Sequence, residues 1–150
     1  MDDAAIREAV ESDLPAILGV YSEAGIDSSD AFSVEEARAQ LARFRQYPSC
    51  RVFVAELGVE IAGTYTLLIL DKLGKRGTPA GVVEDVAVVP RYQGRGIGRA
   101  MMRHAMEECR AAGCYKLTLS SNLKREAAHR FYDGLGFERH GYSFRIELDR

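Results

Sequence analysis

The segment that most constrains the fold is a glycine-rich turn between an apolar strand and an amphipathic helix. A β-rich run at residues 82–89 ends at Pro90, because proline cannot donate a hydrogen bond to a strand ladder. Three glycines then stand at alternate positions, Gly94, Gly96 and Gly98. Apolar residues at helical spacing follow to about Ala112, and Gly113 is typical of a helix end. The chain is therefore expected to contain a strand–turn–helix unit.

A turn of this kind offers an anion site where the helix begins. Glycine lets the backbone approach a ligand closely and adopt positive φ. The first N–H groups of a helix lack partners within the helix, and the helix dipole adds positive potential there. A phosphate or pyrophosphate group is the expected ligand. A tight turn that binds nothing is the alternative interpretation.

Two familiar phosphate-binding motifs do not fit this turn. A Walker A loop ends in Gly-Lys-Ser or Gly-Lys-Thr, whereas Gly98 is followed by Arg99 and Ala100. A dinucleotide fingerprint has the spacing G-x-G-x-x-G after the first strand of a domain. Here the spacing is G-x-G-x-G and the motif lies late in the chain. Neither a nucleotide hydrolase nor a dehydrogenase is indicated.

The turn resembles a signature of the GNAT superfamily of N-acetyltransferases. Gln93-Gly94-Arg95-Gly96-Ile97-Gly98 matches its pattern Q/R-x-x-G-x-G/A. A second block downstream, Ala128-His129-Arg130-Phe131-Tyr132 followed by Gly136-Phe137, is similar to the family's other conserved segment. The resemblance implies an α/β fold with a mixed, mostly antiparallel sheet flanked by helices. It also implies a splayed pair of parallel strands that holds the cofactor, and residues 1–150 are expected to form one such domain.

The remaining elements are predicted from periodicity and capping. Ser12 or Asp13 is expected to cap a first helix, and Ser33 to Glu36 has the form of a capping box that opens a second helix ending near Phe44. A hairpin is expected to turn around Gly58. The other expected elements are strands at residues 6–10, 51–56, 61–70, 115–121 and 142–148 and a helix at residues 125–135.

The cofactor implied by the resemblance is acetyl-CoA, and no metal is expected. The loop amides would hold its pyrophosphate, and basic side chains would neutralise its phosphates. The backbone of Val86 and Val88 would pair with the pantetheine arm, in a strand that commonly carries a bulge in this family. An amide of Val86 or Ala87 would face the thioester oxygen. The residues assigned to the cofactor are Val86, Ala87, Val88, Gln93, Gly94, Arg95, Gly96, Ile97, Gly98, Arg99, Asn122, Lys124 and Tyr132. Arg91 and Arg125 lie in the same segments and are further candidates.

Three residues are candidates for acid–base catalysis. By resemblance, Tyr132 would protonate the leaving thiolate, with a packing role as the alternative. The acceptor amine must lose a proton, since an alkylammonium has a pKa near ~10.4. Alternation along a strand lets only one of Glu84 and Asp85 face a cleft directly. Glu84 is the favoured base, acting directly or through a water, and Asp85 is expected to contact the substrate or to have a structural role. A solvated ion pair is the alternative for either carboxylate.

Composition excludes several other classes. The formal charge of -2 argues against a nucleic-acid partner. No apolar run approaches the ~20 residues that span a bilayer, and the acidic start does not look like a secretory signal. The cysteines, Cys50, Cys109 and Cys114, form no C-x-x-C pair, so neither a zinc site nor a disulfide framework is indicated. A cytoplasmic protein is expected.

The acceptor is the least constrained part of the prediction. Acceptor residues are expected from residues 21–32 and 72–79, where Asp27 and Asp30 could attract a cationic amine. A small primary amine is the expected acceptor, because the chain is compact and shows no appended recognition module. The segment around Lys124 is similar to aminoalkylphosphonate N-acetyltransferases, and aminoglycosides, polyamines and amino acids are alternative acceptors. A protein N-terminus or lysine is an alternative acceptor, and a non-catalytic acetyl-CoA sensor is an alternative function. A homodimer is a further expectation from the family.

Overall fold

The hairpin expected around Gly58 forms the middle of the central sheet. The computed structural model describes residues 4–27, 32–47 and 49–149. Strand β2 (Cys50–Leu57) pairs antiparallel with β3 (Glu60–Leu70), and Gly58 has a φ of 66° in the turn between them. Glycine adopts this left-handed conformation without the steric cost that a Cβ would bring. The predicted hairpin is confirmed.

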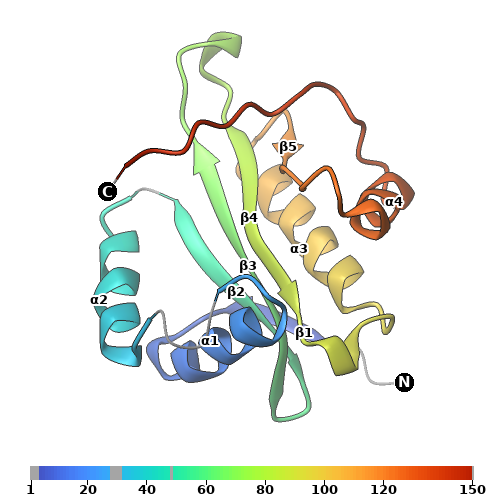
Figure 1. Ribbon diagram of the computed structural model, residues 1–150. Helices are drawn as coiled ribbons and strands as arrows, with labels where there is room; N and C mark the ends of the chain where they lie inside the picture. Colours follow the sequence, from blue (N-terminus) through green and yellow to red (C-terminus); the bar gives the residue numbers. More distant parts are fainter. Residues whose placement is uncertain (1–3, 28–31, 48, 150) are drawn as a thin grey trace. The chain divides into compact units, whose positions relative to one another are not determined.

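Within the described residues, the sheet has five strands in the order β1-β2-β3-β4-β5. β1 (Ala5–Glu8) is antiparallel to β2, and β4 (Ala80–Val88) is antiparallel to β3. β5 (Leu117–Thr118) is parallel to β4. The fold is thus the expected α/β arrangement with a mixed, mostly antiparallel sheet (Figure 1).

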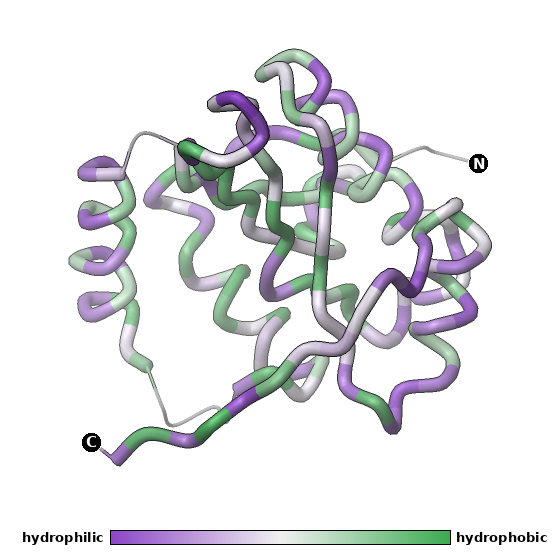
Figure 2. Tube along the Cα trace, turned by 90° about the horizontal axis from the view of Figure 1, so that it is seen from above, coloured by the Kyte–Doolittle hydropathy of each residue, from purple (hydrophilic) through white to green (hydrophobic). Residues whose placement is uncertain are grey.

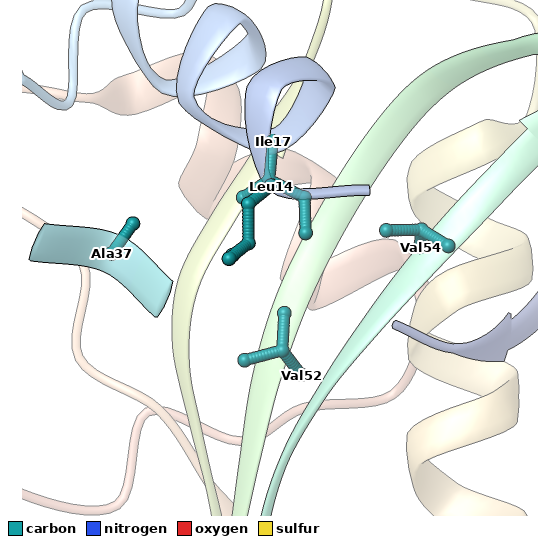
Figure 3. Close-up of a cluster of buried hydrophobic side chains, with 5 residues drawn as sticks. All are labelled: Leu14, Ile17, Ala37, Val52 and Val54. Atoms are coloured by element: carbon teal, nitrogen blue, oxygen red, sulfur yellow. The ribbon is translucent and has the colours of Figure 1, made fainter. Parts of the chain in front are cut away.

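Two helices cover one face of this sheet. α1 (Leu14–Glu23) follows a short 3-10 turn at Glu11–Asp13, and α2 is Val34–Phe44. The capping box of α2 is present as predicted, because Ser33 and Glu36 exchange side-chain and backbone hydrogen bonds of 3.1 Å. The buried cluster between these helices and β2 is shown in Figure 3: Leu14, Ile17, Ala37, Val52 and Val54.

The predicted side-chain cap of α1 is not present. Asp13 occupies the N-cap position but makes no side-chain cap hydrogen bond to the helix. Its carboxylate accepts instead from the backbone N–H of Val10 at 2.8 Å and from the guanidinium of Arg7 at 2.7 and 2.8 Å. The carboxylate oxygens of Asp13 are therefore bound by Arg7 of β1 and by Val10, and they do not cap the helix.

The helix after the glycine turn covers the other face of the sheet (Figure 1). α3 spans Ile97–Ala111, close to the predicted bounds. Its buried side chains recur at helical spacing: Ile97, Met101, Met102, Ala105 and Cys109. The helix approaches β3 closely at Gly63, where an added Cβ would lie 3.1 Å from Met101 and 3.2 Å from Ile97. Only glycine leaves room for that approach.

Two 3-10 turns flank β4, and the strand β5 beside it is short. A 3-10 turn at Lys75–Gly77 lies in the loop before β4, and another at Pro90–Tyr92 follows β4. β5 is shorter than the strand expected at residues 115–121. Residues Met1–Thr118 form one compact unit and Leu119–Arg150 a second, smaller one.

The closing strand expected at residues 142–148 is wrong for the described chain. The second unit contains α4 (Glu126–Gly134), near its predicted bounds, and then an extended segment that pairs with no described strand. Apolar and polar residues alternate along that segment (Figure 2). Its apolar side chains are exposed: Tyr142, Phe144, Ile146 and Leu148. The alternation is that of a strand, but a strand exists only when its backbone groups have ladder partners.

Among the residues that the structure describes, no helix is long and apolar enough to cross a membrane.

Candidate functional site

Strand β4 carries a bulge at the position of the predicted catalytic carboxylates. Glu84 lies opposite Thr66 and Ala87 opposite Thr64, so two residues of β4 face the single residue Tyr65 of β3. The first of the two, Asp85, has a φ of 52°. An extra residue in one strand bends that strand and interrupts its ladder. The sequence resemblance implied such a bulge, and the structure places it at Asp85.

The bulge changes the expected orientation of the two carboxylates. Strict alternation would turn Glu84 and Asp85 to opposite faces, but both residues are exposed, although neighbouring groups partly desolvate the Asp85 carboxyl. Alternation holds only while each residue keeps extended φ and ψ, and Asp85 does not. Strict alternation therefore does not hold at this pair, and both carboxylates remain candidates for the base.

Tyr65, the residue opposite the bulge, is held in place by a stacked ring and a hydrogen bond. The fully buried ring of Tyr65 stacks on Phe53 with 5.2 Å between ring centroids. The Tyr65 hydroxyl lies 2.7 Å from Nδ1 of His104 on α3. Burial lowers the pKa of His104, so its ring is neutral near pH 7 and Nδ1 can accept the hydroxyl proton in a hydrogen bond. The residue opposite the bulge is thus fixed on both sides.

Acidic and phenolic groups gather on the other side of β4. Burial raises the pKa of the Asp85 carboxyl, and the negative charge of Asp27 raises it further. Burial also raises the pKa of Tyr21 to about 12, with a contribution from the charge of Asp85. Tyr21 belongs to α1, and sequence reasoning placed it only within a broad acceptor segment. Asp30, the other predicted acceptor residue, lies outside the described residues.

The glycine turn has the geometry of an anion site. Gly94 and Gly96 have φ values of 79° and 83°, and Gly96 is the N-cap of α3. No side chain caps this helix and its first turn contains no acidic residue. The N–H groups of Ile97, Gly98 and Arg99 therefore have no partners within the helix, and they lie at the positive end of the helix dipole. The side-chain amide of Gln93 donates to the backbone oxygen of Val88 at 3.3 Å and so ties the turn to β4.

The arginines of this turn differ in their availability. Arg91 forms ion pairs with Glu23 at 3.4 Å and with Glu60 at 3.2 Å, so its charge is already neutralised. Arg95 lies over the ring of Tyr92, 5.4 Å from the centroid. Within the described residues, neither Arg95 nor Arg99 has an ion-pair partner. Arg95 and Arg99 are thus better placed than Arg91 to meet a phosphate.

Among the described residues, one edge of β4 has no strand partner beside the bulge. β4 and β5 are matched only at Gly81 with Leu117 and at Val82 with Thr118. β5 ends there, so residues 83–88 have no β5 ladder. Val86, Ala87 and Val88, which were assigned to the cofactor, lie in this stretch. A strand edge without a ladder presents N–H and C=O groups that an extended ligand can pair with.

The second unit carries the other predicted residues. The side-chain oxygen of Asn122 accepts from the backbone N–H of Lys124 at 2.9 Å, which orders the turn before α4. His129 donates from Nε2 to the backbone oxygen of Asn122 at 2.8 Å. The ring of Tyr132 packs edge-on against Phe131 and Phe137, with centroid distances of 5.1 and 5.6 Å. Burial raises the pKa of Tyr132, so its hydroxyl keeps its proton near neutral pH.

A metal centre finds no support in the part of the chain that the structure describes. No group of three or more His, Cys, Asp or Glu side chains there could hold a metal ion.

Comparisons with known proteins point to one family. A model described as the acetyltransferase (GNAT) family matches residues 19–137. The glucosamine 6-phosphate N-acetyltransferase of Trypanosoma brucei brucei is 35% identical over 149 residues, covering 97% of each chain. The aminoalkylphosphonate N-acetyltransferase of Salmonella typhimurium is 38% identical over 64 residues, 43% of this chain and 42% of that protein. A crystal structure of a Trypanosoma brucei acetyltransferase superposes with a TM-score of 0.83 at 32% identity, covering 97% of this chain and 100% of that one.

Proposed function

This chain belongs to the acetyltransferase (GNAT) family, and on that premise we propose that it transfers the acetyl group of acetyl-CoA to a primary amine of a small molecule. The observation that carries the proposal is the bulged stretch of β4, which has an edge unpaired with β5 directly before the glycine turn. The unpaired edge of β4 suits the extended arm that carries the thioester, and the glycine turn that follows it suits the pyrophosphate.

The proposed binding site for acetyl-CoA is built from those features. The amides between Gln93 and Arg99 receive the pyrophosphate, and the backbone of Val86 and Val88 pairs with the pantetheine arm. Arg95, Arg99 and Lys124 supply positive charge for the phosphates. Asn122 supports the turn that carries Lys124, which the hydrogen bond between the two residues favours.

Acetyl-CoA supplies an activated acyl group in a thioester. An amide of Val86 or Ala87 donates to the thioester oxygen as negative charge develops on it. The bulge supports this assignment, because a bulge leaves backbone groups without ladder partners where Tyr65 faces two residues.

The acceptor amine is deprotonated by a carboxylate on β4. Asp85 is the stronger candidate, although Glu84 was favoured from the sequence. Asp85 stands at the bulge itself, and its raised pKa makes the carboxylate a better proton acceptor than an ordinary aspartate. Asp27 lies close enough to raise that pKa and adds negative charge that attracts the ammonium form of the acceptor.

The hydroxyl of Tyr132 donates its proton to the departing thiolate. A partly buried phenol that is neutral at pH 7 holds a proton to give, and the raised pKa of Tyr132 fits this role. The edge-on packing of Phe131 and Phe137 restricts the ring to one orientation.

We infer that the acceptor carries a phosphate or phosphonate group beside its amine. Two relatives are named for acceptors of this kind, glucosamine 6-phosphate and an aminoalkylphosphonate. The relative named for glucosamine 6-phosphate matches over almost the whole chain, which makes a phosphorylated amino sugar the first acceptor to test.

The test is release of free thiol from acetyl-CoA in the presence of single amines. Glucosamine 6-phosphate and glucosamine form a matched pair that differs only in the phosphate, and an aminoalkylphosphonate and its alkylamine form another. We expect turnover with the phosphorylated member of at least one pair and much slower turnover with its partner. Equal turnover within both pairs would contradict the acceptor class. Turnover only on peptides would indicate protein acetylation, and tight acetyl-CoA binding without any turnover would indicate a sensor.

We also propose that the enzyme works in the cytoplasm as a homodimer and without nucleic acid. The exposed apolar side chains of residues 142–148 support association. Burying four such side chains in each copy would remove on the order of 1,200 Å² in total, the lower limit for a stable interface. The formal charge of -2 supports the absence of a nucleic-acid partner.

A further inference from the structure

The end of α3 brings two cysteines together. Gly113 has a φ of 78°, its N–H donates to the oxygen of Arg110 at 3.0 Å, and the N–H of Cys114 donates to the oxygen of Cys109 at 2.9 Å. These two hydrogen bonds define a Schellman motif, with Cys109 in the last turn of the helix and Cys114 just beyond the glycine. The side chains at these two positions commonly touch across the motif. The cysteines are five positions apart in sequence, and the motif brings them close together in space.

The two thiols interact but differ in environment. Cys109 is buried with 5% of its surface exposed, whereas Cys114 is partly exposed. Burial raises the pKa of the Cys109 thiol to about 12, and the neighbouring Cys114 thiol adds to the rise. Cys114 is therefore the thiol that a reagent in solution reaches first, and Cys109 is the thiol next to it.

Cys109 lies against the short ladder between β4 and β5, which consists of two residue pairs in the described chain. A Cβ added to Gly81 would come within 2.4 Å of the Cys109 sulfur and 3.2 Å of Leu117. Gly81 is paired with Leu117, and its N–H donates to the oxygen of Lys116 at 2.9 Å. Cys114 is three residues from Leu117 along the chain. A covalent link at this point would join the end of α3 to the start of β5.

We propose that Cys109 and Cys114 form a reversible intramolecular disulfide, so that the end of α3 is a site of oxidative modification. The oxidant is a small-molecule disulfide. The Cys114 thiolate attacks one of its sulfurs, which forms a mixed disulfide and releases the first small thiol. The Cys109 thiolate then attacks the Cys114 sulfur and displaces the second small thiol. The two cysteines lose two electrons and two protons, and the small-molecule disulfide gains them as two thiols.

This modification is independent of the acetyl-transfer proposal, because neither cysteine takes part in that reaction. It also differs from ordinary surface thiol chemistry. Cys50 lies on β2, and burial raises the pKa of its thiol as well, but no second cysteine adjoins it among the described residues. Cys50 thus serves as an internal comparison for a thiol that has no partner.

The experiment treats the full-length folded protein with excess oxidised glutathione, followed by denaturation, thiol titration and intact-mass measurement. The expected product retains one free thiol of the three cysteines and weighs about 2 Da less than the reduced protein. Non-reducing peptide mapping should link Cys109 to Cys114, and dithiothreitol should reverse the change. Cys50→Ser should behave in the same way, with both remaining thiols lost.

Single variants of the pair test the order of attack. Cys109→Ala should accumulate a glutathione adduct on Cys114, because the resolving thiol is gone. Cys114→Ser should leave Cys109 reduced for at least as long as the wild type takes to oxidise. Circular dichroism verifies that each variant is folded, and Cys109→Ser replaces Cys109→Ala if the alanine variant is not. Stable glutathione adducts on wild-type Cys114 without the loss of mass would overturn the proposal, as would a disulfide that involves Cys50.

Discussion

Asp85 shows how a single residue sets the chemistry of this strand. A non-glycine residue at a φ of 52° is uncommon, and aspartate is one of the few that tolerates the left-handed region. Its conformation breaks the alternation of β4, leaves two carboxylates exposed together and places one of them near Asp27 and Tyr21. The identity of Asp85 could be noted from the sequence, but its backbone conformation could not, because it depends on the pairing with Tyr65.

The role of Asp85 can be tested by removing its charge at nearly constant shape. Asp85→Asn should lower kcat by about 10²-fold or more, the usual contribution of a positioned base. Because the deprotonated carboxylate is the active form, wild-type activity should fall as pH falls through a pKa above that of an ordinary aspartate. This acid limb should vanish in Asp85→Asn. The measurement is the pH profile of kcat with each variant.

Glu84→Gln is the matched control for that experiment, since it removes the neighbouring charge on the same strand. We expect it to cause the smaller loss and to keep the acid limb. A larger loss in Glu84→Gln than in Asp85→Asn would return the role of base to Glu84, the residue that the sequence alone favours.

The role of Tyr132 can be tested by removing only its hydroxyl. Tyr132→Phe removes the hydroxyl and keeps the ring that packs on Phe131 and Phe137. The expected result is a fall in kcat of about 10²-fold with the Kd for acetyl-CoA nearly unchanged, because the proton transfer is lost and the packing is not. Phe131→Leu is a control for packing. If Tyr132→Phe turned over at the wild-type rate, the hydroxyl would have no part in the reaction.

At the scale of elements, local patterns predicted the parts of the fold that local interactions determine. The hairpin at Gly58, the capping box at Ser33 and the amphipathic α3 all follow from residues close together in sequence. The bulge, the brevity of β5 and the absence of a strand at residues 142–148 depend on partners far along the chain. Alternating apolar residues predict the conformation of a strand but not whether a sheet edge is available to it.

The contact of β3 with β4 and α3 gives a prediction for Gly63. In Gly63→Ala the new Cβ would lie 3.0 Å from the Ala87 oxygen, 3.1 Å from Met101 and 3.2 Å from Ile97. We expect the free energy of unfolding to drop by about 1 to 3 kcal/mol, as for overpacked cores, because the backbone oxygen cannot move aside cheaply. Urea denaturation measures it.

Gly19→Ala in α1 is the control, because nothing lies within 4 Å of its Cβ position. This change should leave stability equal or raise it by about 0.5 to 1 kcal/mol through helix propensity. A Gly63→Ala protein as stable as the wild type would show that α3 and β4 can separate more readily than their packing indicates.

At the scale of the whole molecule, the second unit poses the question of association. Its residues 142–148 expose four large apolar side chains at alternate positions, and an exposed apolar patch of this kind is typical of an interaction surface. We predict that the protein is a dimer at micromolar concentration and that Phe144→Glu shifts it to a monomer, as measured by light scattering during gel filtration. Arg145→Glu, at the neighbouring polar position, should remain dimeric. A wild-type monomer would contradict the proposed homodimer.

Titration with acetyl-CoA by calorimetry measures whether the glycine turn before α3 binds the cofactor. Gly96→Ala should weaken binding at least about tenfold, because alanine resists a φ of 83° and the turn that presents the free amides would distort. Gly58→Ala imposes a comparable strain at a φ of 66° in the hairpin and should bind as the wild type does. Equal affinity in all three proteins would contradict the assignment of this turn to acetyl-CoA.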